Sequence, residues 1–164
     1  MILLRQSLVR LGLAALLALA LLLAFPGRTA AHDIPSRVTV FAFVVPQGRT
    51  LRMVIRVPLE AMRDVNFPLS GPGYLDVAAS APLVHDAAKV WLADEVQLYE
   101  GDVRLGAPSI TATHVSLPSD RSFADFRSAL EHTLGPPLPP DTQLMWKQAM
   151  LDVILEYPIA SDRS

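Results

Sequence analysis

Residues 38–45 read VTVFAFVV, a run of β-branched and aromatic side chains without helical spacing. Such side chains favour an extended backbone, so the run predicts a strand. Residues 46–50 (PQGRT) have the composition of a hairpin loop. Residues 51–57 (LRMVIRV) then alternate, with the arginines on one face together with Val54, and apolar side chains alone on the other. We therefore expect these two strands to form an antiparallel hairpin.

The remaining sequence predicts more strands and a few helices. Residues 96–99 and 103–105 flank a Gly-containing turn, and residues 110–117 and 151–157 alternate as strands do. Apolar spacing predicts helices within 83–92 and 123–134, the first with Asp86 near its start and the second opened by Ser122 and Asp125 as a weak capping box. Residues 58–63 predict a helical turn, and residues 142–148 fit either a helical turn or a strand.

This order of elements lacks a regular alternation of strand and helix. It predicts an α+β fold, made mainly of an antiparallel β-sheet or a small β-sandwich with two or three inserted helices packed at one side. An all-β sandwich with helical insertions is the alternative.

The N-terminal residues have the plan of a secretory signal. Arg5 and Arg10 precede an apolar run from Leu11 to Phe25, and residues 29–31 (TAA) offer small side chains for cleavage. The run is shorter than the roughly 20 residues of a spanning helix. We expect residues 1–31 to be a signal peptide and residues 32–164 to be a single extracytoplasmic, β-rich domain, most simply periplasmic. An uncleaved inner-membrane anchor is the alternative.

Charge and cysteine content narrow the function classes. Removal of residues 1–31 takes away Arg5, Arg10 and Arg28 from the 14 basic residues and none of the 16 acidic ones. The acidic remainder argues against nucleic acid or an anionic membrane surface as a partner. The chain has no cysteine, which excludes thiol catalysis, cysteine-ligated zinc and iron–sulfur clusters.

Few residues suggest a site. Cleavage after Ala31 would leave His32 with a free α-amine beside Asp33, a pair that could chelate a divalent nickel, copper or zinc ion; the alternative is that the identity of this first residue is incidental. No other cofactor and no small-molecule substrate is indicated. His85, His114 and His132 lack metal-ligand spacing, and His114 is expected to face solvent from its strand.

Five segments together resemble a bacterial family: residues 32–35 (HDIP), 52–62 (RMVIRVPLEAM), 73–76 (GYLD), 117–123 (LPSDRSF) and 155–159 (LEYPI). They are similar to the N-terminal extracytoplasmic part of HupE/UreJ-type membrane proteins. The resemblance implies a role near nickel or cobalt handling at the membrane. Members carry several membrane helices after this part, and the sequence up to Ser164 has none, so we expect any transport pathway to lie in another polypeptide.

Three functions are therefore considered. The first is a non-enzymatic exported domain, accessory to metal handling, whose partner is a multi-spanning membrane protein. The second is a structural or protein-interaction β-sandwich module of the cell envelope. The third is a hydrolase, which would require a polar cleft that unites Ser119 or Ser122 with a histidine and an acid; turn and capping roles explain these serines without catalysis.

Overall fold

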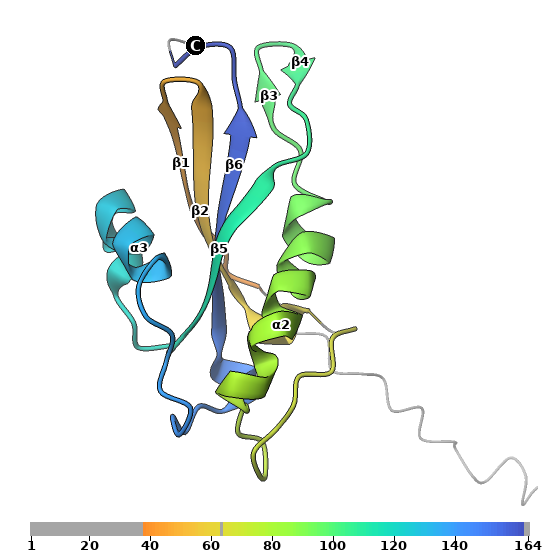
Figure 1. Ribbon diagram of the computed structural model, residues 1–164, viewed down its shortest axis with the longest axis vertical. Coiled ribbons are helices and arrows are strands. Elements are labelled where there is room, and N and C mark those ends of the chain that lie inside the picture. Colours follow the sequence, from red (N-terminus) through yellow and green to blue (C-terminus); the bar gives the residue numbers. More distant parts are fainter. Residues whose placement is uncertain (1–37, 63, 163–164) are drawn as a thin grey trace, which may run out of the picture. The chain divides into compact units, whose positions relative to one another are not determined.

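A four-stranded antiparallel sheet with strand order β1-β2-β6-β5 forms the centre of this computed structural model (Figure 1). The structure describes residues 38–62 and 64–162. The strands are β1 (Phe41–Gln47), β2 (Thr50–Pro58), β5 (Ser109–Ser116) and β6 (Met150–Pro158). A separate two-stranded ribbon is formed by β3 (Tyr99–Glu100) and β4 (Val103–Arg104). The antiparallel α+β prediction is confirmed, with one main sheet instead of a sandwich.

The predicted hairpin is the first pair of this sheet. Gln47 pairs with Thr50 across a two-residue turn of Gly48 and Arg49. Gly48 has a φ of 63° and no non-glycine residue of the described chain has positive φ, which matches a type II′ turn with glycine at its first central position. The strand begins at Phe41, so Val38 to Val40 precede it.

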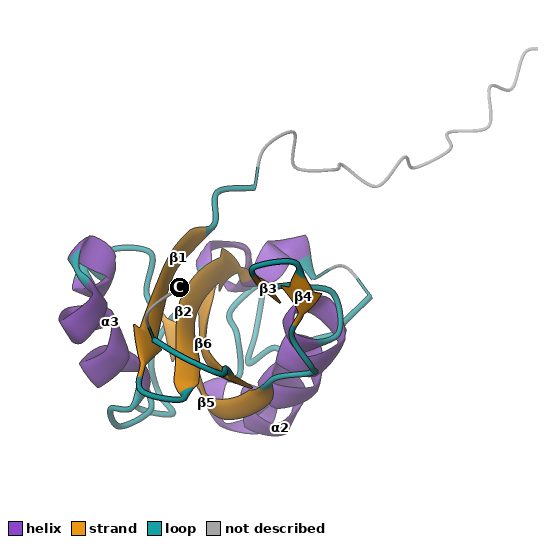
Figure 2. Ribbon diagram, turned by 90° about the horizontal axis from the view of Figure 1, so that it is seen from above, coloured by secondary structure: helices purple, strands orange, loops and turns teal. Residues whose placement is uncertain are grey.

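The two helices lie on opposite faces of the sheet (Figure 2). Helix α2 (Val77–Ala88) covers the face that carries the odd-numbered apolar side chains of β2 and β6, such as Ile55 and Val153. Helix α3 (Phe126–Thr133) covers the other face, where Val54 and Ile154 pack against Ala129. The expectation that the helices pack at one side is therefore wrong: both faces of β2 and β6 carry buried apolar residues, and each face needs a cover.

Helix α2 begins six residues before the predicted start. The side chain of Asp76 accepts a hydrogen bond from the backbone N–H of Ala79 and caps the first turn, although Pro82 lies inside the helix. Asp86, expected near the start, lies in the last turn. The helix continues into a π-helical turn, η2 (Lys89–Ala93), which covers the end of the predicted segment.

Helix α3 is capped by Asp125, whose carboxylate accepts hydrogen bonds from the backbone N–H and the hydroxyl of Ser128. The predicted Ser122 cap is wrong, because Ser122 begins a separate 3-10 turn, η3 (Ser122–Ala124). A 3-10 turn, η1 (Leu59–Ala61), falls in the segment predicted to hold a helical turn. For residues 142–148, where the sequence fits a helical turn or a strand, the structure has the 3-10 turn η4 (Trp146–Gln148).

The described residues all fall within one compact unit. Across residues 38–62 and 64–162, no helix combines the length and the apolar character that crossing a bilayer requires. The expected signal peptide and the cleavage point lie outside the described residues.

Candidate functional site

A cluster of charged and polar side chains lies on the face of the sheet that helix α3 covers. We call it the polar cluster and define it by its members: Arg56, His114, Ser116, Asp120, Ser122, His132 and Asp152. Arg56, His114, Ser116 and Asp152 are buried, and the others are partly exposed. Buried charges are uncommon unless they are paired, so the partners of each group decide what the cluster can do.

Arg56 and Asp152 form the centre of the cluster. They face each other directly across β2 and β6, and the guanidinium donates from Nε to Oδ1 at 2.6 Å and from Nη2 to Oδ2 at 2.7 Å. The arginine side chain is 5% exposed and the aspartate 0%. Such a two-pronged pair is the strongest geometry available to an arginine and a carboxylate.

Asp120 binds the same guanidinium from the loop before η3. Arg56 Nη2 lies 2.8 Å from Asp120 Oδ1, and Nη1 donates to the Asp120 carbonyl at 3.2 Å. Burial alone would raise the pKa of Asp120, but hydrogen bonds from Ser122 and Arg56 outweigh it and bring the pKa to about 2. Burial would likewise lower the pKa of Arg56, yet the bonds to Asp152 and Asp120 hold it above its ordinary value.

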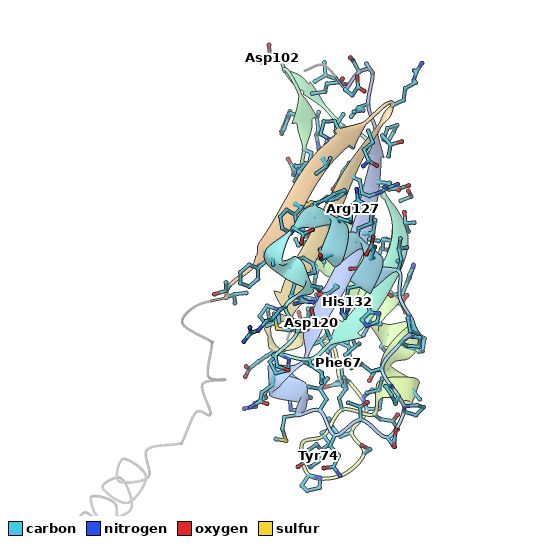
Figure 3. All side chains as sticks on the ribbon, turned by 90° about the vertical axis from the view of Figure 1, so that its left-hand side faces the viewer. Phe67, Tyr74, Asp102, Asp120, Arg127 and His132 are labelled. Atoms are coloured by element: carbon cyan, nitrogen blue, oxygen red, sulfur yellow. The ribbon has the colours of Figure 1, made fainter. Side chains whose placement is uncertain are left out.

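Helix α3 joins the cluster through His132. Its Nε2 lies 2.8 Å from Ser116 Oγ, and its Nδ1 lies 3.6 Å from Asp120 Oδ2 (Figure 3). Nε2 is also 3.6 Å from Asp152 Oδ2. His132 is placed in the last turn of α3, where the helix dipole favours a positive charge, as the sequence indicates.

His114 is buried, contrary to the expectation that it faces solvent. It is 6% exposed, and its ring centroid lies 4.6 Å from that of His132. Burial and the neighbouring His132 both lower the pKa of His114. The expectation failed because α3 covers this face of the sheet, so alternation along β5 does not separate a buried side from a wet one.

In space, His132 lies between Ser116 and Asp120, as the histidine of a serine hydrolase triad lies between the serine and the acid. The hydrogen atoms of this group are arranged differently. The single Ser116 hydrogen is donated to Asp152 Oδ2 at 2.6 Å. His132 Nε2 must then donate to the Ser116 oxygen, because a hydroxyl has only one hydrogen to give. A general base needs a free lone pair at that nitrogen, and a nucleophile needs access to substrate, whereas Ser116 is 0% exposed.

The serines named from the sequence do not occupy that position. Ser122 donates its hydroxyl to Asp120 and accepts from Arg56 at 3.2 Å, so it serves the ion network. Ser119 is exposed on the turn before it.

A small pocket reaches the cluster from outside. Its volume is about 260 Å³, and its lining includes Arg56, Asp120, Phe41 and Phe123. The guanidinium carbon of Arg56 lies 4.2 Å from the centre of the Phe123 ring, so that ring covers the arginine. A neighbouring pocket of about 460 Å³ includes Val38 and shares Pro118 and Met150 with the first. Both pockets are at the end of the sheet where β1 begins.

Metal ligation finds no support within the described ranges. In residues 38–62 and 64–162, no group of three or more histidine and acidic side chains is arranged to hold a metal ion. His32 and Asp33, the ligands named from the sequence, lie outside these ranges, so the chelation hypothesis stays a prediction.

Comparison of the chain with protein-family models, with curated proteins and with solved structures finds no match. The resemblance to HupE/UreJ-type proteins accordingly stays a prediction.

Proposed function

We propose that this chain is an exported, non-enzymatic interaction domain that docks on a multi-spanning membrane protein through the free edge of strand β1. The observation that carries the proposal is this edge: β1 pairs with β2 on one side and has no strand on its other side within the described part of the chain.

The edge is apolar and open to solvent. Phe41 and Val44 are 48% and 47% exposed, and Val38 and Val40, just before the strand, are 46% and 48% exposed. Residues 38–47 contain no charged side chain. Proteins ordinarily protect such an edge with charges, prolines or bulges, since an apolar edge pairs readily with other strands. Strand β1 has one such residue, Pro46 at its turn end, and residues 41–45 have neither a charge nor a proline. An edge left in this state is suited to strand addition by a partner.

The hydrogen-bonding groups of β1 suit that role. Residues beside a two-residue hairpin turn exchange hydrogen bonds, so Gln47, Val45, Phe43 and Phe41 direct their backbone groups toward β2. Ala42 and Val44 then direct theirs outward. Pro46, which has no N–H, falls at an outward position, where its missing donor costs the β1–β2 ladder nothing.

Three further observations support the remaining parts of the proposal. The signal-like residues 1–31 support export. The resemblance to the part of HupE/UreJ-type proteins that precedes their membrane helices supports a multi-spanning partner, with a link to nickel or cobalt handling. The inverted proton arrangement at Ser116 and His132 supports a role without catalysis.

The test is native cross-linking and capture from membranes of cells that express the whole chain. Val44→Pro removes one outward N–H without touching the β1–β2 ladder, and we expect it to abolish capture of a multi-spanning protein. Val103→Lys is the matched control, since it changes an apolar side chain that is 69% exposed on β4, away from the edge.

Two outcomes would contradict the proposal or favour its alternative. Capture that survives Val44→Pro overturns docking through β1. Capture of an envelope protein without membrane helices, lost in the same variant, favours the alternative of a structural module of the cell envelope.

A further inference from the structure

A further pocket lies on the α2 side and shares no lining residue with the polar cluster or with β1. Its volume is about 470 Å³, within the range of about 300–1,000 Å³ that small-molecule sites occupy. Helix α2, the π-helical turn η2 and the loop before α2 supply its walls. The pocket is therefore large enough to hold a small ligand.

The lining combines apolar and acidic side chains. Leu83, Val90 and Trp91 provide apolar surface, and Asp64, Asp86 and Glu95 provide three carboxylates. Among the described residues that line the pocket, none is a lysine, arginine or histidine. Binding sites for small molecules usually have this composition, mainly apolar with a few polar groups that select the ligand.

Lys89, which precedes Val90 in the chain, pairs with an acid outside the lining. Lys89 Nζ lies 3.0 Å from Asp94 Oδ2, and Asp94 is not part of the lining. His85 Nδ1 is 3.9 Å from Asp86 Oδ1, which is too long for a hydrogen bond. Within the described residues, the three lining carboxylates therefore have no basic partner within hydrogen-bond distance.

Trp91 is positioned by an unusual turn of backbone. It is half-buried, packs against the main core and also lines the pocket. The π-helical turn Lys89–Ala93 carries both Val90 and Trp91, and turns of this kind occur frequently at functional sites. An indole ring is the best partner of an organic cation among aromatic side chains.

We propose that this pocket binds an amphipathic organic cation, that is, an ammonium group with an alkyl or aryl body. The apolar side chains take the body, and the three carboxylates with the indole take the charge. This assignment rests on the α2 face alone and is independent of docking through β1.

The test is isothermal titration calorimetry of the purified whole chain with benzyltrimethylammonium chloride. Benzyl alcohol and benzoate serve as neutral and anionic probes of similar size. We expect saturable binding of the cation, weakening as salt rises, and no measurable binding of benzoate.

Glu95→Gln and Asp86→Asn remove charge at exposed positions and should each weaken binding by about two- to fivefold, the usual effect of one solvent-exposed charge pair. Trp91→Leu should weaken binding by a similar or larger factor. Asp102→Asn is the matched control, because it removes an exposed carboxylate that lies between β3 and β4, outside the lining, and should leave binding unchanged. Circular dichroism of each variant checks the fold.

Three outcomes would overturn the assignment: no binding at millimolar cation, equal binding of benzyl alcohol, or an equal loss in Asp102→Asn and Glu95→Gln. Displacement of the cation by a lysine-rich peptide of higher affinity would instead identify the pocket as a protein-docking site.

Discussion

Two arginine–carboxylate pairs join the same two strands, and they differ mainly in burial. Arg56 faces Asp152 and Arg52 faces Glu156, each pair directly across β2 and β6. Both are short, at 2.6 Å. The Arg52–Glu156 side chains are 26% and 25% exposed, whereas the Arg56–Asp152 side chains are 5% and 0% exposed. The pairs form a matched comparison within one protein.

We predict that Asp152→Ala destabilises the protein by about 3–5 kcal/mol, because it leaves a buried guanidinium without its main partner. Ser116 also loses the acceptor of its hydroxyl hydrogen. Glu156→Ala should cost about 1 kcal/mol or less, since its partner stays in contact with water. At roughly 3–5 °C per kcal/mol for a domain of this size, Asp152→Ala should lower Tm by about 10–20 °C.

Urea unfolding followed by circular dichroism gives both free energies. The double variant Arg56→Met/Asp152→Leu extends the test, because replacing both charges should cost less than Asp152→Ala alone. The reasoning is refuted if Asp152→Ala and Glu156→Ala differ by less than about 1 kcal/mol, a value typical of exposed pairs.

Three further predictions concern single side chains. The pKa of Asp120 is lowered from 3.8 to about 2, so its carboxylate contributes about 2 kcal/mol to the free energy of unfolding above pH 4, and this contribution is lost as pH falls toward 2. In urea unfolding, Asp120→Asn should therefore be less stable than the wild type at pH 7 and equally stable near pH 2. Burial lowers the pKa of His114 below 6.5, so the folded state is favoured by the neutral imidazole above pH 6.5 and loses this stabilisation as pH falls below that value. The Tm of His114→Gln should therefore fall less between pH 7 and pH 5 than the Tm of the wild type. Tyr157 is 1% exposed, and its hydroxyl has no hydrogen-bond partner among the described residues. Tyr157→Phe should therefore raise the free energy of unfolding by up to about 1 kcal/mol, whereas a decrease of that size would show that the hydroxyl has a partner.

The strands could be predicted because their signal is local. Alternation in 51–57 and 151–157 places the correct residues on each face of β2 and β6, and turn residues mark the hairpin. The start of α2 could not be read in this way, because Pro82 resembles a helix boundary. Packing of Val77 and Ser80 and the cap by Asp76 extend the helix past it.

The polar cluster was missed, although one signal for it is present. Arg52 and Arg56 are four residues apart on one strand, and Asp152 and Glu156 are four apart on another. If the strands pair antiparallel in the right register, both opposite-charge pairs meet at once. The sequence does not state which strands are neighbours, and it does not show that α3 buries one pair and leaves the other wet. Those facts arise from topology.

The arrangement of the chain ends has a mechanical consequence. The described chain enters the sheet at the start of β1, level with Asp152, and leaves it at Pro158, level with the β1–β2 turn. Strand β2 lies between β1 and β6 and runs antiparallel to both. A force that pulls the two ends apart therefore acts along the strands and loads the hydrogen bonds of both ladders together in shear. Hydrogen bonds loaded in shear must break nearly simultaneously, whereas a hairpin pulled from its open end loses one hydrogen bond at a time. The domain should therefore resist unfolding by a force applied between its two ends.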